Sequence, residues 1–168
     1  QGGDIRYVQQ DVTDEANWDA LFDELGKTVG APDVLVNNAG DCILKPIDDY
    51  PVETLRYMLQ MNIEACFMGT HRAMKAMGAK NGGSIVNMSS VAGLKGGVNG
   101  TAYGASKAGM TMFTKAAAQE GKPFGIRVNS VHPGLIWGDG VVDAMGEDGA
   151  AKFRKMIVAR TPLKMVGA

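Results

Sequence analysis

The sequence has no apolar run that approaches the roughly 20 residues a helix needs to cross a bilayer. Its first ten residues, QGGDIRYVQQ, lack the charged and then apolar pattern of a secretory signal. Lysine and arginine are scattered and the formal net charge is −1, so the basic footprint of a nucleic-acid-binding protein is missing. These absences predict a cytoplasmic protein that acts on neither a membrane nor a nucleic acid.

Cysteine and histidine are also scarce. Cys42 and Cys66 match no metal-binding or redox spacing, and we expect free thiols in a reducing compartment rather than a disulfide. His71 and His132 stand alone, with no carboxylate or cysteine at metal-ligand spacing. The sequence therefore predicts no metal site, and we expect both histidines to be structural.

Glycine is abundant instead, with 23 of 168 residues, which is close to twice the usual share of about 7%. The glycines follow no repeat, which argues against a solenoid or a low-complexity segment. A hydrophobic share of 45% and a charged share of 21% are ordinary for a globular chain of about one domain.

Four short runs rich in β-branched residues predict buried strands, at residues 5–12, 33–40, 83–90 and 126–134. Helical patterns lie between them, at residues 15–29, 52–77 and 101–120. Alternating strands and helices predict an α/β fold with a doubly wound parallel sheet. This is a Rossmann-like fold of three α/β/α layers, with helices on both faces of the sheet.

In such a sheet a ligand binds beyond the carboxyl ends of the strands, and all four predicted strands end in small or polar residues. Tyr103 and Lys107 are four residues apart on a predicted helix, thirteen residues after Ser90, so their polar ends share a face. A Tyr–Lys pair alone is more often a surface pair. A phenol, an ammonium and a hydroxyl that converge there would form a proton-transfer device.

These motifs together resemble the short-chain dehydrogenase/reductase family. NNAG ends one predicted strand and SS ends the next, while YGASK and RVNSVHPG follow in the family's order and spacing. The resemblance runs from about Asp4 to the end of the chain. The pieces VNMSSVAG, AYGASK, RVNSVHPGLI and ARTPL are most similar to those of bacterial secondary-alcohol and hydroxysteroid dehydrogenases.

The resemblance implies an NAD(P)-dependent oxidoreductase that interconverts a small-molecule secondary alcohol and its ketone by hydride transfer. It assigns Tyr103 as general acid/base, activated by the charge of Lys107, Ser90 as a donor to the substrate oxygen and Asn62 as the holder of a water chain. Contacts with NAD or NADP are implied for Asp11 and Val12 at the adenine, Asn38, Ala39 and Gly40 beside the ribose, Tyr103 and Lys107, and Pro133, Gly134 and Ile136 along the nicotinamide.

Other readings stay open. A reductase of 3-ketoacyl groups bound to a carrier protein has the same fold, and a non-catalytic binding or scaffold relative is the alternative of another class. Gly138 stands where the family has a threonine, and residues 138–149, with four glycines, are expected to form a mobile substrate lid. The resemblance also implies a homo-oligomer, a dimer or a tetramer, through the helices at residues 52–77 and 101–120.

The glycine-rich loop that cradles the cofactor pyrophosphate is missing from the sequence. In the strand order 3-2-1-4-5-6, residues 5–12 would be the third strand and residues 33–40 the fourth. We therefore expect residues 1–168 to be a portion of a Rossmann-like domain, from its third strand through the lid, with an apolar edge exposed on the fourth strand. The choice between NAD and NADP, the substrate and its stereochemistry are left open.

Overall fold

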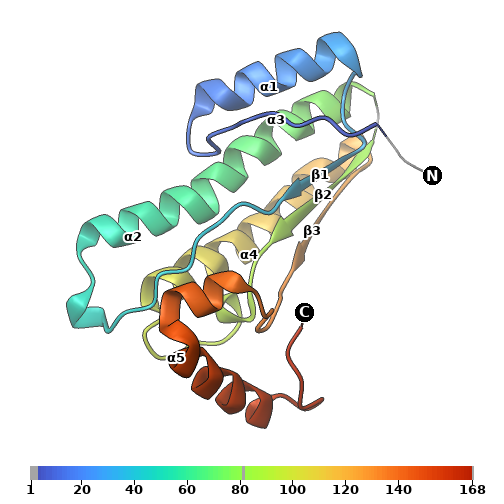
Figure 1. Ribbon diagram of the computed structural model, residues 1–168. Coiled ribbons are helices and arrows are strands. Elements are labelled where there is room, and N and C mark those ends of the chain that lie inside the picture. The colour runs from blue at the N-terminus through green and yellow to red at the C-terminus, as the bar shows by residue number, and fades with distance from the viewer. Residues whose placement is uncertain (1–3, 81, 168) are drawn as a thin grey trace. The chain divides into compact units, whose positions relative to one another are not determined.

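The computed structural model describes residues 4–80 and 82–167. Three parallel strands, β1 (Val34–Asn37), β2 (Gly83–Met88) and β3 (Ile126–Val131), form a sheet in that order, and Figure 1 shows them side by side. Val36 lies opposite Val86, and Asn87 lies opposite Ser130. Because all strands run the same way, their polar carboxyl ends meet at one edge. The predicted α/β fold with a parallel sheet is confirmed.

The described helices are α1 (Glu15–Thr28), α2 (Val52–Leu59), α3 (Ala65–Ala79), α4 (Thr101–Gly121) and α5 (Asp139–Arg160). The first begins at Asp14, whose carboxylate accepts a hydrogen bond from the Ala16 amide at 2.9 Å. It ends before Gly30, which has the positive φ of +84° that glycine tolerates. The helices predicted at residues 15–29 and 101–120 are confirmed to within one residue.

The long helix predicted at residues 52–77 is divided. Between α2 and α3 the backbone makes one π-helical turn, Gln60–Glu64. Such a turn inserts an extra residue into an α-helix and often occurs at functional sites. Asn62 lies in this turn and is fully buried. The turn therefore introduces a buried amide side chain into a helix whose apolar pattern looks continuous in the sequence.

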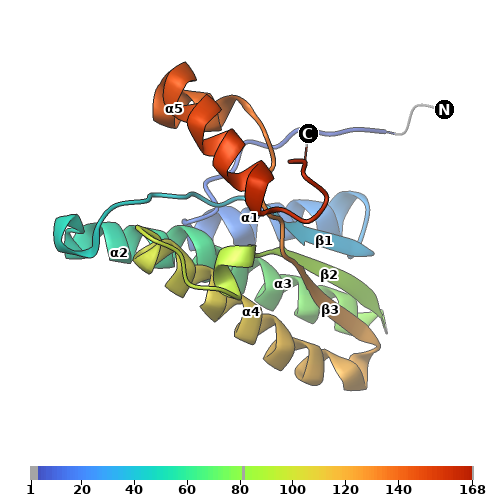
Figure 2. The same cartoon turned by 90° about the horizontal axis from the view of Figure 1, so that it is seen from below.

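Helices α3 and α4 lie side by side against the sheet (Figure 2). Met77 and Ile85 are fully buried at the centre of the core, which is formed by Ala73, Met77, Ile85, Ala117, Ile126 and Val128. Fully burying a side chain of the size of Ile85 stabilises the fold by about 1.5–3 kcal/mol. On β1, by contrast, Val34 and Val36 are more than half exposed, at 57% and 54%.

A buried polar network ties the two helices to the strands. Asn37 on β1 donates to the side-chain oxygen of Asn87 at 2.9 Å and to the Thr70 hydroxyl of α3 at 3.1 Å. Asn87 on β2 donates in turn to the hydroxyl of Thr114 on α4 at 3.0 Å. Each of these buried amides therefore has partners, as a packed interior requires. The network fixes how α3 and α4 sit on the carboxyl half of the sheet.

The strand predicted at residues 5–12 is wrong. None of these residues lies in a strand, and the side chains of Ile5 and Tyr7 are 91% and 89% exposed. A strand exists only where a neighbour satisfies its backbone groups. Among the described residues no strand pairs with this segment, so its apolar pattern alone does not produce β structure.

Residues Pro133–Ala168 form a compact unit of their own, apart from Gln1–His132. The segment 138–149, predicted as a mobile lid, lies mostly within α5, which has a break at Gly146, where φ is +67°. Its mobility stays a prediction. The Trp137 amide donates to the Gly167 carbonyl at 2.8 Å, and the Arg154 guanidinium lies 5.4 Å from the Trp137 ring. Among the residues described, no helix is long and apolar enough to cross a membrane.

Candidate active site

Tyr103 and Lys107 lie one turn apart near the start of α4. The Lys107 Nζ is 5.8 Å from the centre of the Tyr103 ring. Lys107 is only 5% exposed, and its Nζ donates to the carbonyl oxygen of Met88, at the end of β2, at 2.9 Å. A Cβ added at Gly104 would lie 3.2 Å from the Ala92 carbonyl oxygen. The small residue between Tyr103 and Lys107 therefore lets the turn after Ser90 pack against α4.

Ser90 begins that turn. Its Oγ accepts a hydrogen bond from the Ala92 amide at 3.1 Å, which caps the short 3-10 helix Val91–Gly93. A Cβ at Gly93 would come within 2.7 Å of the Lys107 carbonyl, so a glycine is needed for this close approach. Ser89 binds from the other side, since its hydroxyl donates to the same Lys107 carbonyl at 3.0 Å. Ser90 and Lys107 are thus held against each other by backbone contacts.

Burial dominates the electrostatics of this group. Burial raises the pKa of the Tyr103 phenol, and a hydrogen bond with the Ser90 hydroxyl acts in the opposite direction. Burial likewise lowers the pKa of the Lys107 ammonium. Burial therefore sets the direction of the Tyr103 pKa shift, and the Lys107 ammonium binds the Met88 carbonyl. The predicted activation of Tyr103 by Lys107 stays a prediction.

Asn62 connects three elements behind Lys107. Its Nδ2 donates to the Asp41 carbonyl at 2.9 Å and to the Ser106 hydroxyl at 3.0 Å, while its Oδ1 accepts from the Asp41 amide at 3.0 Å. A Cβ added at Gly40 would lie 2.7 Å from the Asn62 Oδ1 and 3.2 Å from the Lys107 Nζ. The loop after β1 therefore passes Lys107 so closely that no side chain fits. The predicted role of Asn62 in a water chain stays a prediction.

Asp41 and Cys42, on this loop, were not predicted from the sequence. The Asp41 carboxylate accepts a hydrogen bond from the Tyr57 hydroxyl of α2 at 2.9 Å, and this contact raises the pKa of Tyr57. Cys42 lies close enough to Tyr103 and Lys107 to affect their pKa values, while burial raises its own pKa. The only signal in the sequence is position, because both residues directly follow the NNAG motif.

The residues predicted at the adenine side lie around two adjoining hollows. Val12, Asn38 and Ala39 line one of about 220 Å³. Asp11 and Val12 line the other. The Asp11 carboxylate accepts from the amide and the hydroxyl of Thr13, at 2.9 and 2.7 Å, and these bonds lower its pKa. A ring-sized hollow with a carboxylate beside it fits the adenosine half of a dinucleotide.

The residues predicted along the nicotinamide belong to the other compact unit. Pro133 and Gly134 open that unit, and Ile136 forms a parallel β-bridge with Gly167. Their contacts with a cofactor stay a prediction.

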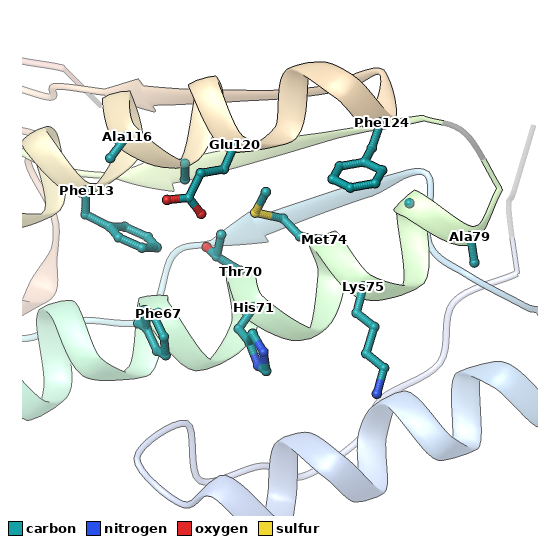
Figure 3. Close-up of a pocket in the computed structure, with 12 residues that line it drawn as sticks. Phe67, Thr70, His71, Met74, Lys75, Ala79, Phe113, Ala116, Glu120 and Phe124 are labelled. Carbon is teal, nitrogen blue, oxygen red and sulfur yellow. The ribbon is translucent and has the colours of Figure 1, made fainter.

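A separate apolar groove of about 720 Å³ lies between α3 and α4, and none of Asn62, Ser90, Tyr103 and Lys107 lines it. Figure 3 shows side chains from both helices around it. Phe67 and His71 stack face to face on α3, with ring centres 6.0 Å apart, and Phe113 of α4 lies 5.9 Å from Phe67. The groove lining consists of Phe67, Thr70, His71, Met74, Lys75, Gly78, Ala79, Phe113, Ala116, Ala117, Glu120 and Phe124.

Comparisons with known proteins identify similar chains. Residues 1–145 match the family model described as short chain dehydrogenase. The chain is 42% identical over 136 residues to the cyclopentanol dehydrogenase of Comamonas testosteroni, which covers 81% of this chain and 54% of that protein. It is 37% identical over 166 residues to the NADP-dependent (R)-specific alcohol dehydrogenase of Lentilactobacillus kefiri, which covers 97% and 64%.

Among solved structures, the chain is similar to ElxO with NADP bound. The TM-score is 0.89 at 31% sequence identity, over 96% of this chain and 65% of that one. The chain thus spans between 54% and 65% of the length of these similar proteins.

Proposed function

The chain belongs to the short-chain dehydrogenase family, and from this membership we propose that the protein transfers hydride between a secondary alcohol and NAD or NADP. One observation carries the proposal. The Ser90 hydroxyl, the Tyr103 phenol and the Lys107 ammonium lie together beside the carboxyl end of β2, each at least half-buried. This is the edge of a parallel sheet at which ligands bind.

In this mechanism Tyr103 exchanges the proton of the substrate oxygen. It accepts the proton when the alcohol is oxidised and donates it when the ketone is reduced. The Ser90 hydroxyl donates a hydrogen bond to the same oxygen and stabilises the charge that develops there. When bound, the nicotinamide supplies the hydride acceptor or donor. The protein supplies position and a path for the proton.

Lys107 also contributes to cofactor binding in this mechanism. An ammonium has three donors, and the Met88 carbonyl takes one of them. The remaining donors are available for the hydroxyl groups of the nicotinamide ribose. At the other end of the cofactor, Val12, Asn38 and Ala39 would hold the adenosine, with Asp11 beside them. Because Gly40 has no side chain, the loop after β1 lies close to Lys107.

The raised pKa of Tyr103 has opposite effects on the two directions of the reaction. Burial keeps the phenol protonated at neutral pH, which suits proton donation to a ketone. Oxidation of an alcohol requires the phenolate, which the positive charge of an oxidised nicotinamide favours. Proton donation to a ketone therefore needs no prior change in Tyr103, whereas oxidation needs a charge that favours the phenolate, which bound oxidised cofactor would supply.

The side chains near Ser90 favour an apolar substrate. Leu94 and Val98, on the loop that follows Ser90, are 59% and 92% exposed. Leu44 reaches toward the end of the same loop, 3.9 Å from a Cβ placed at Gly100. Exposed apolar groups on the loop that follows the reactive serine suit a ligand that is apolar apart from one oxygen. An alicyclic or steroid-like alcohol has this form, and the similarity to a cyclopentanol dehydrogenase supports the choice.

We further propose that a second copy of the chain covers the groove between α3 and α4. Phe67 is 52% exposed there, in a lining that is mostly apolar. Lys75 and Glu120 lie at the same groove with opposite charges. In a two-fold contact the same surface meets itself, so Lys75 of one copy can pair with Glu120 of the other.

The test is an assay of cyclopentanol oxidation by the protein as its gene encodes it, followed by the absorbance of the reduced nicotinamide, with NAD and with NADP. We expect turnover with one nucleotide, and a loss of about 10²–10⁴-fold in Tyr103→Phe, which removes the proton acceptor. Tyr7→Phe is the matched control, since Tyr7 is 89% exposed. Nucleotide binding without turnover on any secondary alcohol would favour the scaffold alternative instead.

A further inference from the structure

His132 at the end of β3 reaches across to the catalytic turn on the neighbouring strand. Its Nδ1 lies 3.2 Å from the backbone carbonyl oxygen of Ser90, and its Nε2 lies 2.9 Å from the hydroxyl oxygen of Ser130. The ring is half-buried between the two strand ends. This histidine has no part in the proton transfer described above, and its sequence position alone suggested only a structural residue in a turn.

The two contacts fix which ring nitrogen carries the proton. A carbonyl oxygen can only accept, so the Nδ1 must be the donor to Ser90. In the neutral ring the Nε2 is then an acceptor, and the Ser130 hydroxyl donates to it. Ser130 therefore selects the tautomer that binds Ser90. The chain Ser130, His132 and Ser90 crosses from β3 to the end of β2.

The Ser90 carbonyl is held on two sides. The Gly93 amide donates to it at 3.0 Å from within the turn, and His132 donates from β3. The preceding residue is also fixed, since the Ser89 amide donates to the Val131 carbonyl at 2.9 Å. The same turn supplies the Ala92 amide that binds the Ser90 Oγ at 3.1 Å, so a contact that fixes the Ser90 carbonyl also fixes the turn that holds the hydroxyl. The direction of the reactive hydroxyl thus depends on a side chain one strand away.

We propose that His132 is a positioning residue for Ser90, which aims the hydroxyl at the substrate oxygen. This inference rests on the proposed dehydrogenase function. The ring of His132 forms its hydrogen bonds with Ser90 and Ser130, so replacing the ring tests a contact apart from the backbone that continues into Pro133. Its loss should lower kcat and leave the KM for the nucleotide unchanged.

The test is a double-mutant cycle in the protein as its gene encodes it, with His132→Leu, Ser90→Ala and the two combined. We expect His132→Leu to lower kcat about tenfold, the size of effect expected when one hydrogen bond that positions the Ser90 hydroxyl is lost. The double variant should be no slower than Ser90→Ala alone, because His132 acts only through the Ser90 hydroxyl. If the losses in kcat of the two single variants multiply in the double variant, the inference is overturned. Full wild-type activity of Ser90→Ala, or an inactive wild type, would instead overturn the proposed function.

Two further measurements do not depend on the folding of the leucine variant. His132→Asn keeps an amide donor near the position of Nδ1 and should restore most of the activity, whereas His132→Gln places its amide near Nε2 and should not. Equal activity of these two variants would contradict the inference. The ring 15N shifts of His132 should show a protonated Nδ1 in the wild type, and a protonated Nε2 with a bare Nδ1 would contradict it whatever the activity.

Discussion

Burial outweighs the Ser90 hydrogen bond in its effect on the pKa of the Tyr103 phenol. Burial raises this pKa, while Lys107, itself buried and with a lowered pKa, donates to Met88. An ammonium near a tyrosine is thus insufficient to make a base, because burial disfavours the charged form of both groups. The proposed chemistry depends on the additional positive charge of an oxidised nicotinamide.

The pH dependence of the two reaction directions follows from this shift. A raised pKa keeps Tyr103 protonated at and above neutral pH, so ketone reduction should not decline between about pH 7 and 9, below the ordinary tyrosine pKa of about 10. Alcohol oxidation needs the phenolate and should become faster over the same interval. The measurement is kcat against pH in both directions, with each nucleotide at saturation. Oxidation that slows as the pH rises to 9 would contradict the assignment of Tyr103.

At the scale of elements, the loop after β1 is a fixed part of the site. Asn62, in the π-helical turn, binds the Asp41 backbone with both ends of its amide, and Tyr57 holds the Asp41 carboxylate. The turn between α2 and α3 thus determines how closely Gly40 approaches Lys107. A side chain at Gly40 would meet Asn62, which is fully buried and has partners on three elements, so that it cannot move aside.

Gly40→Ala tests this packing. The added methyl group should destabilise the protein by about 1–3 kcal/mol, as is typical for overpacking, and weaken nucleotide binding. Gly26→Ala in α1 is the control, since nothing lies within 4 Å of its added Cβ and alanine is the better helix former, by about 0.5–1 kcal/mol. Denaturant unfolding measures the first effect and nucleotide fluorescence the second. If the two variants were equally stable, the close approach would not exist.

Sequence patterns predicted elements where local and tertiary preferences agree. Three strands were found from their β-branched runs, because each has a hydrogen-bonded neighbour and a buried face. Residues 5–12 have the same pattern and no paired strand among the described residues, so the pattern fails there. The π-helical turn at Asn62 was missed because the apolar residues continue through it. The glycines of residues 138–149 predicted a mobile lid, and the segment lies mostly in α5, with a break at Gly146.

At the scale of the whole molecule, the groove between α3 and α4 exposes large apolar side chains. Phe67 and Phe124, both at this groove, are 52% and 51% exposed. Exposed aromatic groups of this kind mark interaction sites. A second copy over the groove would also hold α4, the helix that carries Tyr103 and Lys107, in place.

Phe67→Glu tests the self-association. A carboxylate at the centre of an apolar contact is costly to bury, so the variant should lose the dimer or tetramer and run as a monomer. Met112→Glu is the matched control, since Met112 lies on α4, is 64% exposed and does not line the groove. Light scattering after size-exclusion chromatography measures the mass. A monomeric wild type at every concentration would show that the groove has another use.

The candidate site was more predictable than its surroundings. Ser90, Tyr103 and Lys107 could be singled out from their spacing, because helix geometry and strand ends bring such residues together. The sequence did not single out Asp41, Cys42 and His132. Their contacts join separate elements, and residue spacing does not reveal how those elements pack. Burial, which sets the direction of the Tyr103 pKa shift, is a property of the folded chain that residue spacing does not reveal.

The most direct test of the proposed chemistry is the transfer of an isotope. The protein as its gene encodes it is incubated with oxidised nucleotide and with cyclopentanol that carries deuterium at the carbinol carbon. Hydride transfer with Tyr103 as the base predicts one deuterium in the reduced nicotinamide by mass spectrometry, and almost none with Tyr103→Phe. Reduced nucleotide without deuterium, or equal labelling by the wild type and Tyr103→Phe, would contradict the account.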